Sequence, residues 1–510
     1  MFKLSRRQLA LAGALSLPFF CLSSQAQTTP GGALTLAMVG EPPTLDPAMS
    51  TADLVITIMQ HVVEPLYTWD AQWALVPLLA SGMPKVSADG LTYQIALRSG
   101  VKFHDGRTLG ADDVVASLQR WLSVSPRGKG LAGDVESVTA GSGEVTIKLR
   151  KAYAPLIAQL AMPNAGIMPK DTLAPQLSKF VGTGPFQFKE RRPDQFILLS
   201  RFADYSARTE AASGLGGKRQ ALVDELRFVP VPSANTRLEG AMSGQFQYAD
   251  QLPLESMARL ERQAGVSPVL QSAFGFPYLV FNLREGLMKN PGVRQAVQTG
   301  IGQGQMMAAA FGDSRFYAVE ANHFPRGTPF FTSVGADRYN QGNAAQAKKE
   351  AEAAGYKGEP IRMLTSRQFE FHHTLMQVMA DQMRKAGFTV DLQVVDWATL
   401  VQRRGDAKLW DVFMTHSPMF PEPTLSPPQL GDGAPGWWST TAKDKALDAF
   451  NQQPDPARRG PLWAGVQRVV ADEVPYINMG KFSALSATSD KVQGYAPSLW
   501  PAFWNVSLKR

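Results

Sequence analysis

Residues 97–120 read LRSGVKFHDGRTLGADDVVASLQR and predict the end of a strand, a tight turn and an amphipathic helix. The residues before this stretch alternate between apolar and polar, the period of a half-buried strand. Gly106 suits a tight reversal because glycine adopts positive φ without steric cost. Thr108 is the predicted N-cap, and Asp112 and Asp113 lie where the helix dipole favours negative charge. One apolar face follows at helical spacing, made of Val114, Leu118, Trp121 and Leu122.

The order of residues in this stretch resembles a known signature. It resembles the signature of the peptide- and nickel-type solute-binding proteins of bacterial ABC importers, family five. In that family, a strand that ends L-R-x-G-V-x-F-H-D-G leads into T-A-x-D-V-x-x-S. Here Gly110 stands before Ala111, which is a small departure. Further motifs of that family are GG-x-L with TLDP (31–46), EPLY (64–67), P-x-LA (77–80), V-GTGPF (181–186), F-N with V-R-x-A (281–296), AGY (354–356), V-P-Y-I (474–477) and F-W-N-V (503–506). Each motif is weak alone, but their order and spacing are specific.

Length and composition agree with a globular protein of several domains. A chain of 510 residues is too long for one core and indicates two or three domains. With 44% apolar and 19% charged residues, it is neither disordered nor fibrous. No basic run is interleaved with aromatic residues, which disfavours nucleic acid as a partner.

Residues 1–26 are predicted to be an export signal peptide. An apolar run follows the initial positive charge, and it is too short and too interrupted by Pro18 to anchor in a bilayer. Small residues predict cleavage near Ala26, and removal of three basic residues lowers the formal net charge from +7 to +4. Residues 5–7 resemble a twin-arginine signal, although an ordinary signal is favoured. Cys21, the only cysteine, lies in this segment, so the mature protein is predicted to lack disulfides and thiol nucleophiles.

Three glycine-rich stretches invite comparison with phosphate-binding loops. Residues 181–186 lack a lysine at P-loop spacing, and residues 213–218 fail the P-loop pattern at both flanking positions. Residues 300–304 have the wrong spacing for a dinucleotide fingerprint. All three are interpreted as turns or loosened helix, and no cofactor is implied.

Candidate catalytic and metal-binding side chains have simpler interpretations. The carboxylates of Asp105, Asp112 and Asp113 are explained by capping and by the helix dipole. Glu370, His372 and His373 are the best metal candidates, but no HExxH pattern follows, and a solvated helix start is the favoured interpretation. The sequence contains no GxSxG motif, so a periplasmic hydrolase is a weaker alternative.

Aromatic residues are more informative about a ligand. Trp437 and Trp438 are adjacent at the end of a loop rich in Pro and Gly, residues 421–438. Most tryptophans serve core packing, but two neighbours at such a loop are not expected both to do so, and aromatic walls suit an amphipathic ligand. The predicted ligand-binding residues are Met49, Phe276, Tyr278, Trp397, His416, Trp437 and Trp438.

The resemblance implies an α/β, periplasmic-binding-protein-like fold with two lobes joined by hinge strands, of class II or cluster C type. The N-terminal lobe is expected over 27–278 and 486–510, with an extra subdomain at roughly 67–185. The C-terminal lobe is expected over 279–485. In it, a strand at 361–364, a helix at 371–385 and a strand at 390–394 predict a right-handed crossover in a parallel sheet, with Gly387 as the C′ residue.

The function implied is that of a periplasmic receptor that closes its lobes on a peptide-like or other organic solute. Its partners would be the permease and ATPase of an ABC importer, and a monomer is expected. A peptide chaperone or sensor partner that uses the same cleft is a third hypothesis. The sequence names neither the ligand nor the permease.

One departure from the family concerns the ligand. In peptide-binding members, a strand like residues 410–414 leads into a segment whose aspartate holds the ligand's α-ammonium group. Here residues 415–423 read THSPMFPEP, without aspartate, and Glu422 resembles a later acidic-Pro pair. An ammonium taken into a closed cleft costs several kcal/mol unless an opposite charge meets it. We therefore expect a ligand without a free α-amino group at that point, and not a general di- or oligopeptide receptor.

Overall fold

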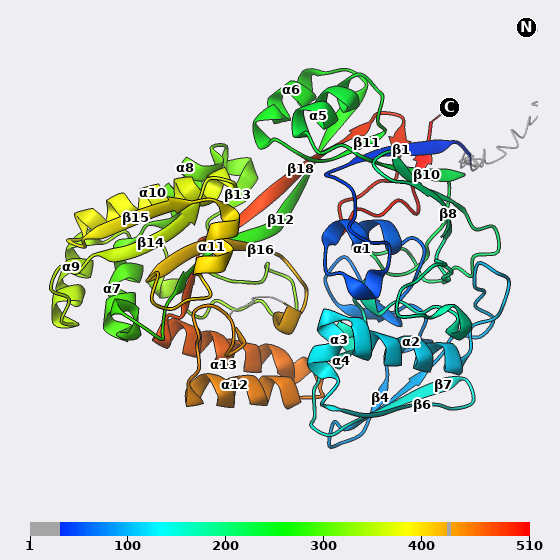
Figure 1. Ribbon diagram of the computed structural model, residues 1–510, viewed down its shortest axis with the longest axis horizontal. Coiled ribbons are helices and arrows are strands. Elements are labelled where there is room, and N and C mark those ends of the chain that lie inside the picture. The colour runs from blue at the N-terminus through cyan, green and yellow to red at the C-terminus, as the bar shows by residue number, and fades with distance from the viewer. Residues whose placement is uncertain (1–30, 426–429, 510) are drawn as a thin grey trace, which may run out of the picture.

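The computed structural model describes residues 31–425 and 430–509, which form two lobes joined by long strands (Figure 1). A mixed sheet of twelve strands runs through both lobes in the order β15-β14-β16-β12-β18-β11-β1-β10-β9-β8, with β13 beside β18 and β17 beside β12. Its strands are β1 (Ala33–Met38), β8 (Phe186–Arg192), β9 (Phe196–Arg201), β10 (Glu225–Pro230), β11 (Tyr248–Leu252), β12 (Val266–Phe281), β13 (Tyr317–Ala318), β14 (Ile361–Ser366), β15 (Val390–Val395), β16 (Val412–Pro418), β17 (Tyr476–Asn478) and β18 (Lys481–Ser489).

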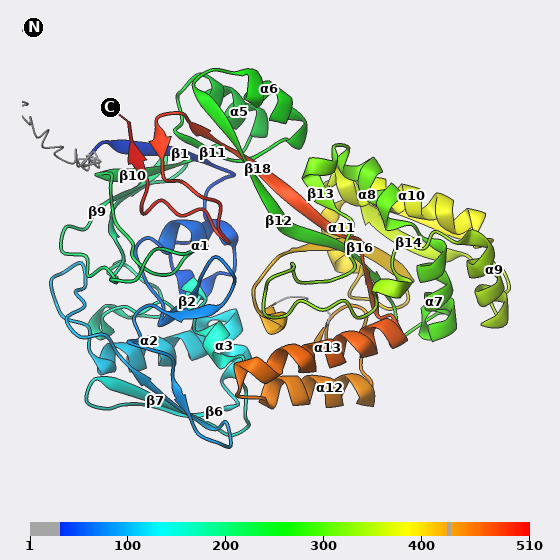
Figure 2. The same cartoon turned by 180° about the vertical axis from the view of Figure 1, so that it is seen from behind.

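Strands β12 and β18 carry this sheet from one lobe to the other (Figure 2). The first part of β12 pairs antiparallel with β18, from Val266 opposite Ser489 to Gly275 opposite Phe482. Its second part pairs with β16, ending with Phe281 opposite Val412. Strand β12 therefore takes part in pairings on both sides of the sheet, from Val266 to Phe281.

The first lobe adds a second layer below the main sheet (Figure 1). Buried Tyr93 and Ile95 alternate with exposed neighbours as the sequence predicts, and Val145, Ile147 and Leu149 do the same on the next strand. The four-stranded sheet has the order β4 (Lys85–Val86), β5 (Thr92–Ala96), β7 (Glu144–Leu149) and β6 (Val135–Ala140). Its other elements are β2 (Tyr67–Trp69), β3 (Leu75–Pro77), α1 (Asp53–Met59), α2 (Ala111–Val124), α3 (Pro126–Leu131) and α4 (Leu156–Gln159). Outside this layer lie α5 (Ala234–Met242) and α6 (Met257–Arg262).

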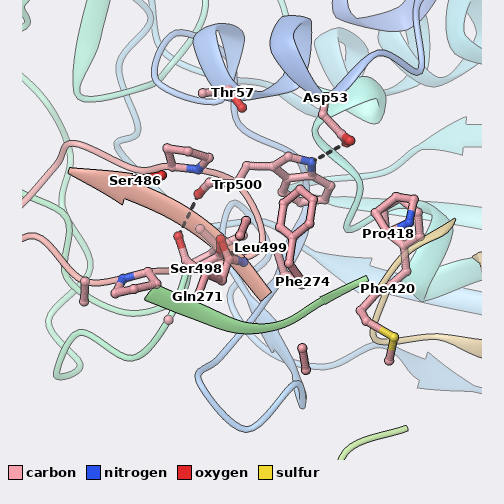
Figure 3. A pocket seen from close by; sticks show the side chains of 18 of the residues that line it. Asp53, Thr57, Gln271, Phe274, Pro418, Phe420, Ser486, Ser498, Leu499 and Trp500 are labelled. Carbon is pink, nitrogen blue, oxygen red and sulfur yellow. Dashed lines mark hydrogen bonds between the residues drawn. The ribbon is translucent and has the colours of Figure 1, made fainter. Parts of the chain in front are cut away.

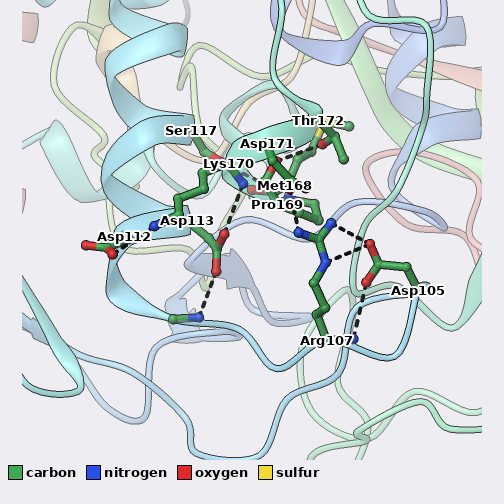
Figure 4. A network of polar contacts seen from close by, with 11 residues as sticks. Asp105, Arg107, Asp112, Asp113, Ser117, Met168, Pro169, Lys170, Asp171 and Thr172 are labelled. Carbon is green, nitrogen blue, oxygen red and sulfur yellow. Dashed lines mark hydrogen bonds and ion pairs between the residues drawn. The ribbon is translucent and has the colours of Figure 1, made fainter.

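Helix α2 begins later than the sequence analysis predicted. Its N-cap is Gly110, whose N–H donates to the Asp113 carboxylate at 3.0 Å. Thr108 is instead held in an antiparallel bridge with Lys102, so its prediction as the N-cap is wrong. The acidic residues of the first turn are confirmed in their place, and Asp113 also accepts from the Lys170 backbone (Figure 4).

Surface ion pairs surround this helix start (Figure 4). Arg107 lies between Asp105 and Asp171, at 2.6 and 2.5 Å, and Lys170 contacts Asp112 at 3.0 Å. All five side chains are about a third or more exposed to solvent. The carboxylates near this turn are thus occupied in capping and surface pairing, in agreement with their interpretation from the sequence.

The second lobe contains the predicted crossover. Strands β14 and β15 pair in parallel, and α10 (Glu370–Lys385) connects them. Gly387 has φ +85°, the left-handed conformation expected of a C′ residue. The other helices of this lobe are α7 (Pro291–Gly300), α8 (Gln303–Phe311), α9 (Ala344–Ala353), α11 (Trp397–Arg403), α12 (Thr441–Gln452) and α13 (Pro456–Glu473).

The chain returns to the first lobe after β18. The Phe503 N–H donates to the ring of buried His61 at 2.9 Å, and Phe503 packs in the same core as Leu34 and Leu36 of β1. A last pair of short strands, β19 (Val492–Gln493) and β20 (Ser507–Leu508), closes this region. In the described part of the chain, no helix is both long and apolar enough for a bilayer span.

The glycine-rich stretches are structural, as the sequence analysis concluded. A Cβ on Gly182 would lie 2.1 Å from the Val62 carbonyl oxygen, and one on Gly184 would lie 2.3 Å from that of His61. The loop at residues 213–218 is a tight turn, in which the Ser213 N–H bonds to the carbonyl of Gly216. These glycines permit close approach of backbones rather than cradle a phosphate.

Candidate functional site: a cavity beside the hinge strands

A cavity of about 570 Å³ lies beside β12 and β18, where the two lobes meet (Figure 3). This volume is in the range of small-molecule sites. Segments from both lobes and from the strands between them form the walls: residues 52–57, 69–73, 214–215, 250–251, 270–274, 418–420, 484–486 and 496–501. The cavity therefore depends on the relative position of the lobes.

One wall of the cavity is aromatic. The rings of Trp69 and Phe420 lie 6.4 and 6.2 Å from the ring of Trp500. Phe274 and Trp73 contribute two further rings. Such a surface contacts the apolar body of a ligand and attracts cations through the faces of its rings.

The backbone is irregular where it lines the cavity. The pairing of β11 with β18 shifts register between Ala249 and Leu252, and that of β12 with β18 shifts between Gln271 and Gly275. Positive φ occurs at three lining residues that are not glycine, namely Trp73, Gln251 and Ala273, at 64°, 43° and 51°. Bulges redirect side chains, and backbone strain of this kind concentrates at functional sites.

Two aspartates bring partly or fully buried carboxyl groups to the wall. Asp53 begins α1 and accepts a hydrogen bond of 2.9 Å from the Trp500 indole N–H (Figure 3). Burial raises the pKa of Asp53. Asp250, at the β11 irregularity, accepts from the Tyr248 hydroxyl at 3.0 Å, and burial raises its pKa to about 6. A third lining aspartate, Asp70, accepts from two backbone N–H groups of its own turn.

The predicted ligand-binding residues lie outside the residues that line this cavity. Met49 is 45% exposed, whereas Phe276 and Tyr278 are buried within β12. Trp397 starts α11, and His416 contacts the ring of His372. Their assignment as ligand contacts stays a prediction. The lining residues Phe274, Pro418 and Phe420 lie two to four positions away from predicted ones along the same strands or the segments that follow them.

The expectation that Trp437 and Trp438 would not both serve packing is wrong. Trp438 is buried, and its indole N–H donates to the Glu473 carboxylate at 2.6 Å. Trp437 stacks on Trp410 with 5.7 Å between ring centroids, and Arg284 covers it at 4.4 Å. A left-handed backbone at Trp437, with φ 51°, directs the two neighbouring rings into different clusters.

The interpretation of residues 370–373 as a solvated helix start is also wrong for both histidines. His372 and His373 are both buried, and His372 packs against His416 of β16. A ring nitrogen of His372 lies 2.9 Å from one of His416, and burial lowers the pKa of both. In residues 31–425 and 430–509, no group of three or more His, Cys, Asp or Glu is placed to hold a metal ion.

Sequence reasoning missed Asp53, Asp250 and Trp500. Asp53 looks like an ordinary residue of a helix start, and Asp250 lies in the middle of the short strand β11 without a motif. Positions 53 and 500 meet through a hydrogen bond across 447 residues of sequence. The sequence around Asp250 carries no signal of a special position, because Ala249 precedes it and the polar Gln251 follows it.

Comparison with known proteins places this chain in a family. Residues 74–434 match the model of the bacterial extracellular solute-binding proteins, family 5. A probable peptide ABC transporter periplasmic-binding protein of Sinorhizobium fredii is 25% identical over 99% of both chains. A glutathione-binding protein of Pectobacterium atrosepticum is 25% identical over 88% of this chain and 89% of its own.

A solved structure shows the same fold. The ABC transporter substrate-binding protein CtaP of Listeria monocytogenes superposes with a TM-score of 0.81 and 20% identity, covering 94% of this chain and 100% of its own. The expected two-lobed α/β architecture is confirmed by this likeness and by the sheet that passes between the lobes. The chain therefore belongs to family 5 of the bacterial extracellular solute-binding proteins.

Proposed function

We propose that this protein is the solute receptor of a peptide-type ABC importer and captures a peptide-like or other small organic solute in the cavity beside β12 and β18. The observation that carries this proposal is the composition of the cavity wall. Helix α1, the strands between the lobes and the segment after β16 all contribute to it, so a ligand there contacts both lobes at once. A ligand that prefers the closed arrangement shifts the receptor toward it.

Contacts on the side away from the hinge support closure. The Ala154 N–H donates to the Asn451 carbonyl at 2.6 Å, and Lys151 pairs with Asp448 at 2.9 Å. These bonds join the lower layer of the first lobe to α12 of the second. We infer that they form on closing and break on opening, as does the ring contact between Phe420 of the second lobe and Trp500 of the first.

The lobes are proposed to consist of residues 27–278 with 486–510 and of residues 279–485, with a subdomain at roughly 67–185. Packing of Phe503 against His61 supports the assignment of the last segment to the first lobe. The export signal over 1–26 and its cleavage near Ala26 lie outside the described residues. We propose a periplasmic monomer that delivers its solute to a permease energised by an ATPase.

Members of the family are binding proteins, and we propose that this chain has no catalytic activity. The lining residues that the structure describes include no histidine, cysteine or lysine to serve as base or nucleophile. Incubation of the protein with a peptide library tests the hydrolase alternative. The appearance of cleaved peptides would establish hydrolase activity.

Native purification provides the main test. Protein isolated from the periplasm without denaturant is analysed by native mass spectrometry, and we expect a bound small solute that is released on unfolding. After refolding without ligand, small-angle X-ray scattering should show a larger radius of gyration, which returns to the smaller value when the solute is added. A protein that carries no solute and keeps one radius under all these conditions would contradict the receptor role.

A further inference from the structure

The cavity wall has an unbalanced set of charges. Its lining includes three aspartates, Asp53, Asp70 and Asp250, and among the described lining residues none is lysine, arginine or histidine. The whole chain, by contrast, carries more basic than acidic residues, with a formal net charge of +7. The acidic lining is therefore a local property of this cavity and not of the protein's composition.

Two arginines act on these aspartates through their charge without lining the cavity. Arg237 lowers the pKa of Asp250 through its charge, but its guanidinium donates to four backbone carbonyls, including those of Asp250 and Gln251. Arg127 acts on Asp53 in the same way and lies 5.6 Å over the ring of Phe420. Neither arginine forms an ion pair within 4.0 Å with these carboxylates in the described structure.

Each of the two carboxylates is held by a neutral donor. The Trp500 indole N–H fixes Asp53, and the Tyr248 hydroxyl fixes Asp250. Neutral donors orient a carboxylate without cancelling its charge. Both groups line the cavity beside the aromatic wall formed by Trp69, Phe420 and Trp500.

We propose that this cavity selects an organic cation, whose protonated amine or guanidinium meets Asp53 and Asp250 while its apolar body lies on the aromatic wall. The proposal rests on the receptor function and names the class of solute. A carboxylate in a site of low water content costs free energy that an opposite charge offsets, so the cation completes the site electrostatically. Aromatic faces add attraction for the same charge.

The same wall disfavours carboxylates on the ligand. A free peptide carries a terminal carboxylate, and glutathione carries two, yet none of the described residues that line the cavity has a cationic side chain to meet them. An anion without a cationic partner is repelled by the three aspartates, and it also pays the free-energy cost of leaving water. Although a relative is named a glutathione-binding protein, we expect this chain not to bind glutathione.

Four fragments of similar size test the charge preference on the refolded, ligand-free full mature protein. These are 2-phenylethylammonium, benzamidinium, neutral 2-phenylethanol and anionic 3-phenylpropionate, compared by calorimetry and thermal shift at matched ionic strength. We expect the two cations to bind at least about tenfold more tightly than the neutral and anionic fragments, the equivalent of one well-placed charge interaction. Binding of 2-phenylethylammonium should weaken from pH 7.5 to pH 5, as Asp250 takes up a proton.

Variants separate the carboxylates from general electrostatics. Asp53→Asn and Asp250→Asn should each remove most of the cation preference. Asp381→Asn, at a solvent-exposed position of α10 where the carboxylate pairs with Arg384, should leave it unchanged. If one lining variant fails to fold, the other variant and the pH profile of the unaltered protein still decide the matter.

The outcomes distinguish this proposal from the receptor role. Equal or tighter binding of the neutral or anionic fragment overturns the cation proposal and leaves the receptor role intact. If no fragment binds, the solute that co-purifies decides: a cation supports the proposal, and a neutral or anionic solute overturns it. If no fragment binds and no solute co-purifies, both proposals fail.

Discussion

The carboxylate of Glu64 and the guanidinium of Arg219 lie 3.1 Å apart, and both side chains are almost completely buried. Glu64 also accepts from the hydroxyls of Thr183 and Tyr205, at 2.9 and 2.7 Å, and Arg219 lies 4.1 Å over the ring of Trp504. The motifs EPLY, GTGPF and FWNV therefore meet in one polar network inside the first lobe. The residues of this network hold the first lobe together, and none of them lines the cavity in the described part of the chain.

Removal of one partner of this pair should destabilise the protein strongly. Glu64→Ala leaves the Arg219 charge buried without its partner, and we expect a loss of about 3–5 kcal/mol in the free energy of unfolding. Urea unfolding followed by circular dichroism measures it. The control is Glu225→Ala, which breaks a solvent-exposed pair with Lys189 and should cost less than about 1 kcal/mol. Equal effects of the two variants would show that burial does not matter here.

Gly184→Ala tests the close approach of backbones in the GTGPF motif. The added Cβ would lie 2.3 Å from the His61 carbonyl oxygen, so backbone must shift. We expect a loss of about 1–3 kcal/mol or more, typical of overpacked cores. Gly133→Ala, where no atom lies within 4 Å of the new Cβ, is the matched control and should unfold like the original protein. A harmless Gly184→Ala would contradict the packing argument.

Asp250→Asn should stabilise the ligand-free protein near neutral pH while it weakens cation binding. Burial raises the pKa of Asp250 from 3.8 to about 6, so the folded state favours the protonated form. Its contribution to stability is complete below about pH 4 and is lost as the pH rises through about 6. At pH 7.5 the variant avoids the cost of a buried carboxylate, and we expect a gain of about 3 kcal/mol, because one pKa unit corresponds to about 1.4 kcal/mol.

Unfolding of both proteins at pH 4 and pH 7.5 measures this effect. The gain should vanish at pH 4, where both proteins carry a neutral side chain at this position. A variant that is less stable at both pH values would show that the carboxyl group serves structure alone.

Removal of an aromatic ring should weaken solute binding when the ring lines the cavity, and not when it only packs against other side chains. Phe420→Ala removes a ring from the cavity wall, and we expect a loss of about 2 kcal/mol in binding of the co-purified solute if this ring is a hot spot. Trp437→Ala removes a ring that stacks on Trp410 and should leave that affinity unchanged. If Trp437→Ala weakens binding and Phe420→Ala does not, the ligand contacts are those predicted from the sequence.

Unmodified peptides should bind poorly. Calorimetry compares three forms of the dipeptide Ala-Phe. The free acid is a zwitterion, the C-terminal amide is a cation, and the N-acetylated amide is neutral. We expect the amide to bind about tenfold more tightly than the other two, because only it combines an ammonium with no carboxylate. Sub-micromolar binding of free di- and tripeptides across varied sequences would establish a general peptide receptor instead.

The sequence predicted those helices and strands whose residues follow a regular pattern of apolar and polar positions. The strands around Tyr93 and Ile147, the unit of β14, α10 and β15, and the turn at Gly387 follow from alternation, helical spacing and backbone preference. The order of motifs predicted the two-lobed architecture. Local signals were less reliable at Thr108, where a bridge to Lys102 competes with capping.

The cavity itself was not predictable from these signals. Its wall combines segments near residues 53, 250, 272, 419 and 500, which only the complete fold brings together. The irregular pairing of β11 and β12 breaks the strand period where the lining residues lie, so alternation assigns them no face. The burial of His372 likewise depends on contact with His416, on a strand distant in sequence.

The hydrogen bond from Trp500 to Asp53 joins an early part of the chain to a part that is synthesised late, 447 residues further on. During synthesis, the cavity lacks this wall until the segment around Trp500 has left the ribosome and reached the folding lobe. Earlier intermediates hold α1 and Asp53 without the indole that orients its carboxylate. The order in which the chain is made therefore sets the moment at which the proposed binding site first exists, which is close to the end of synthesis.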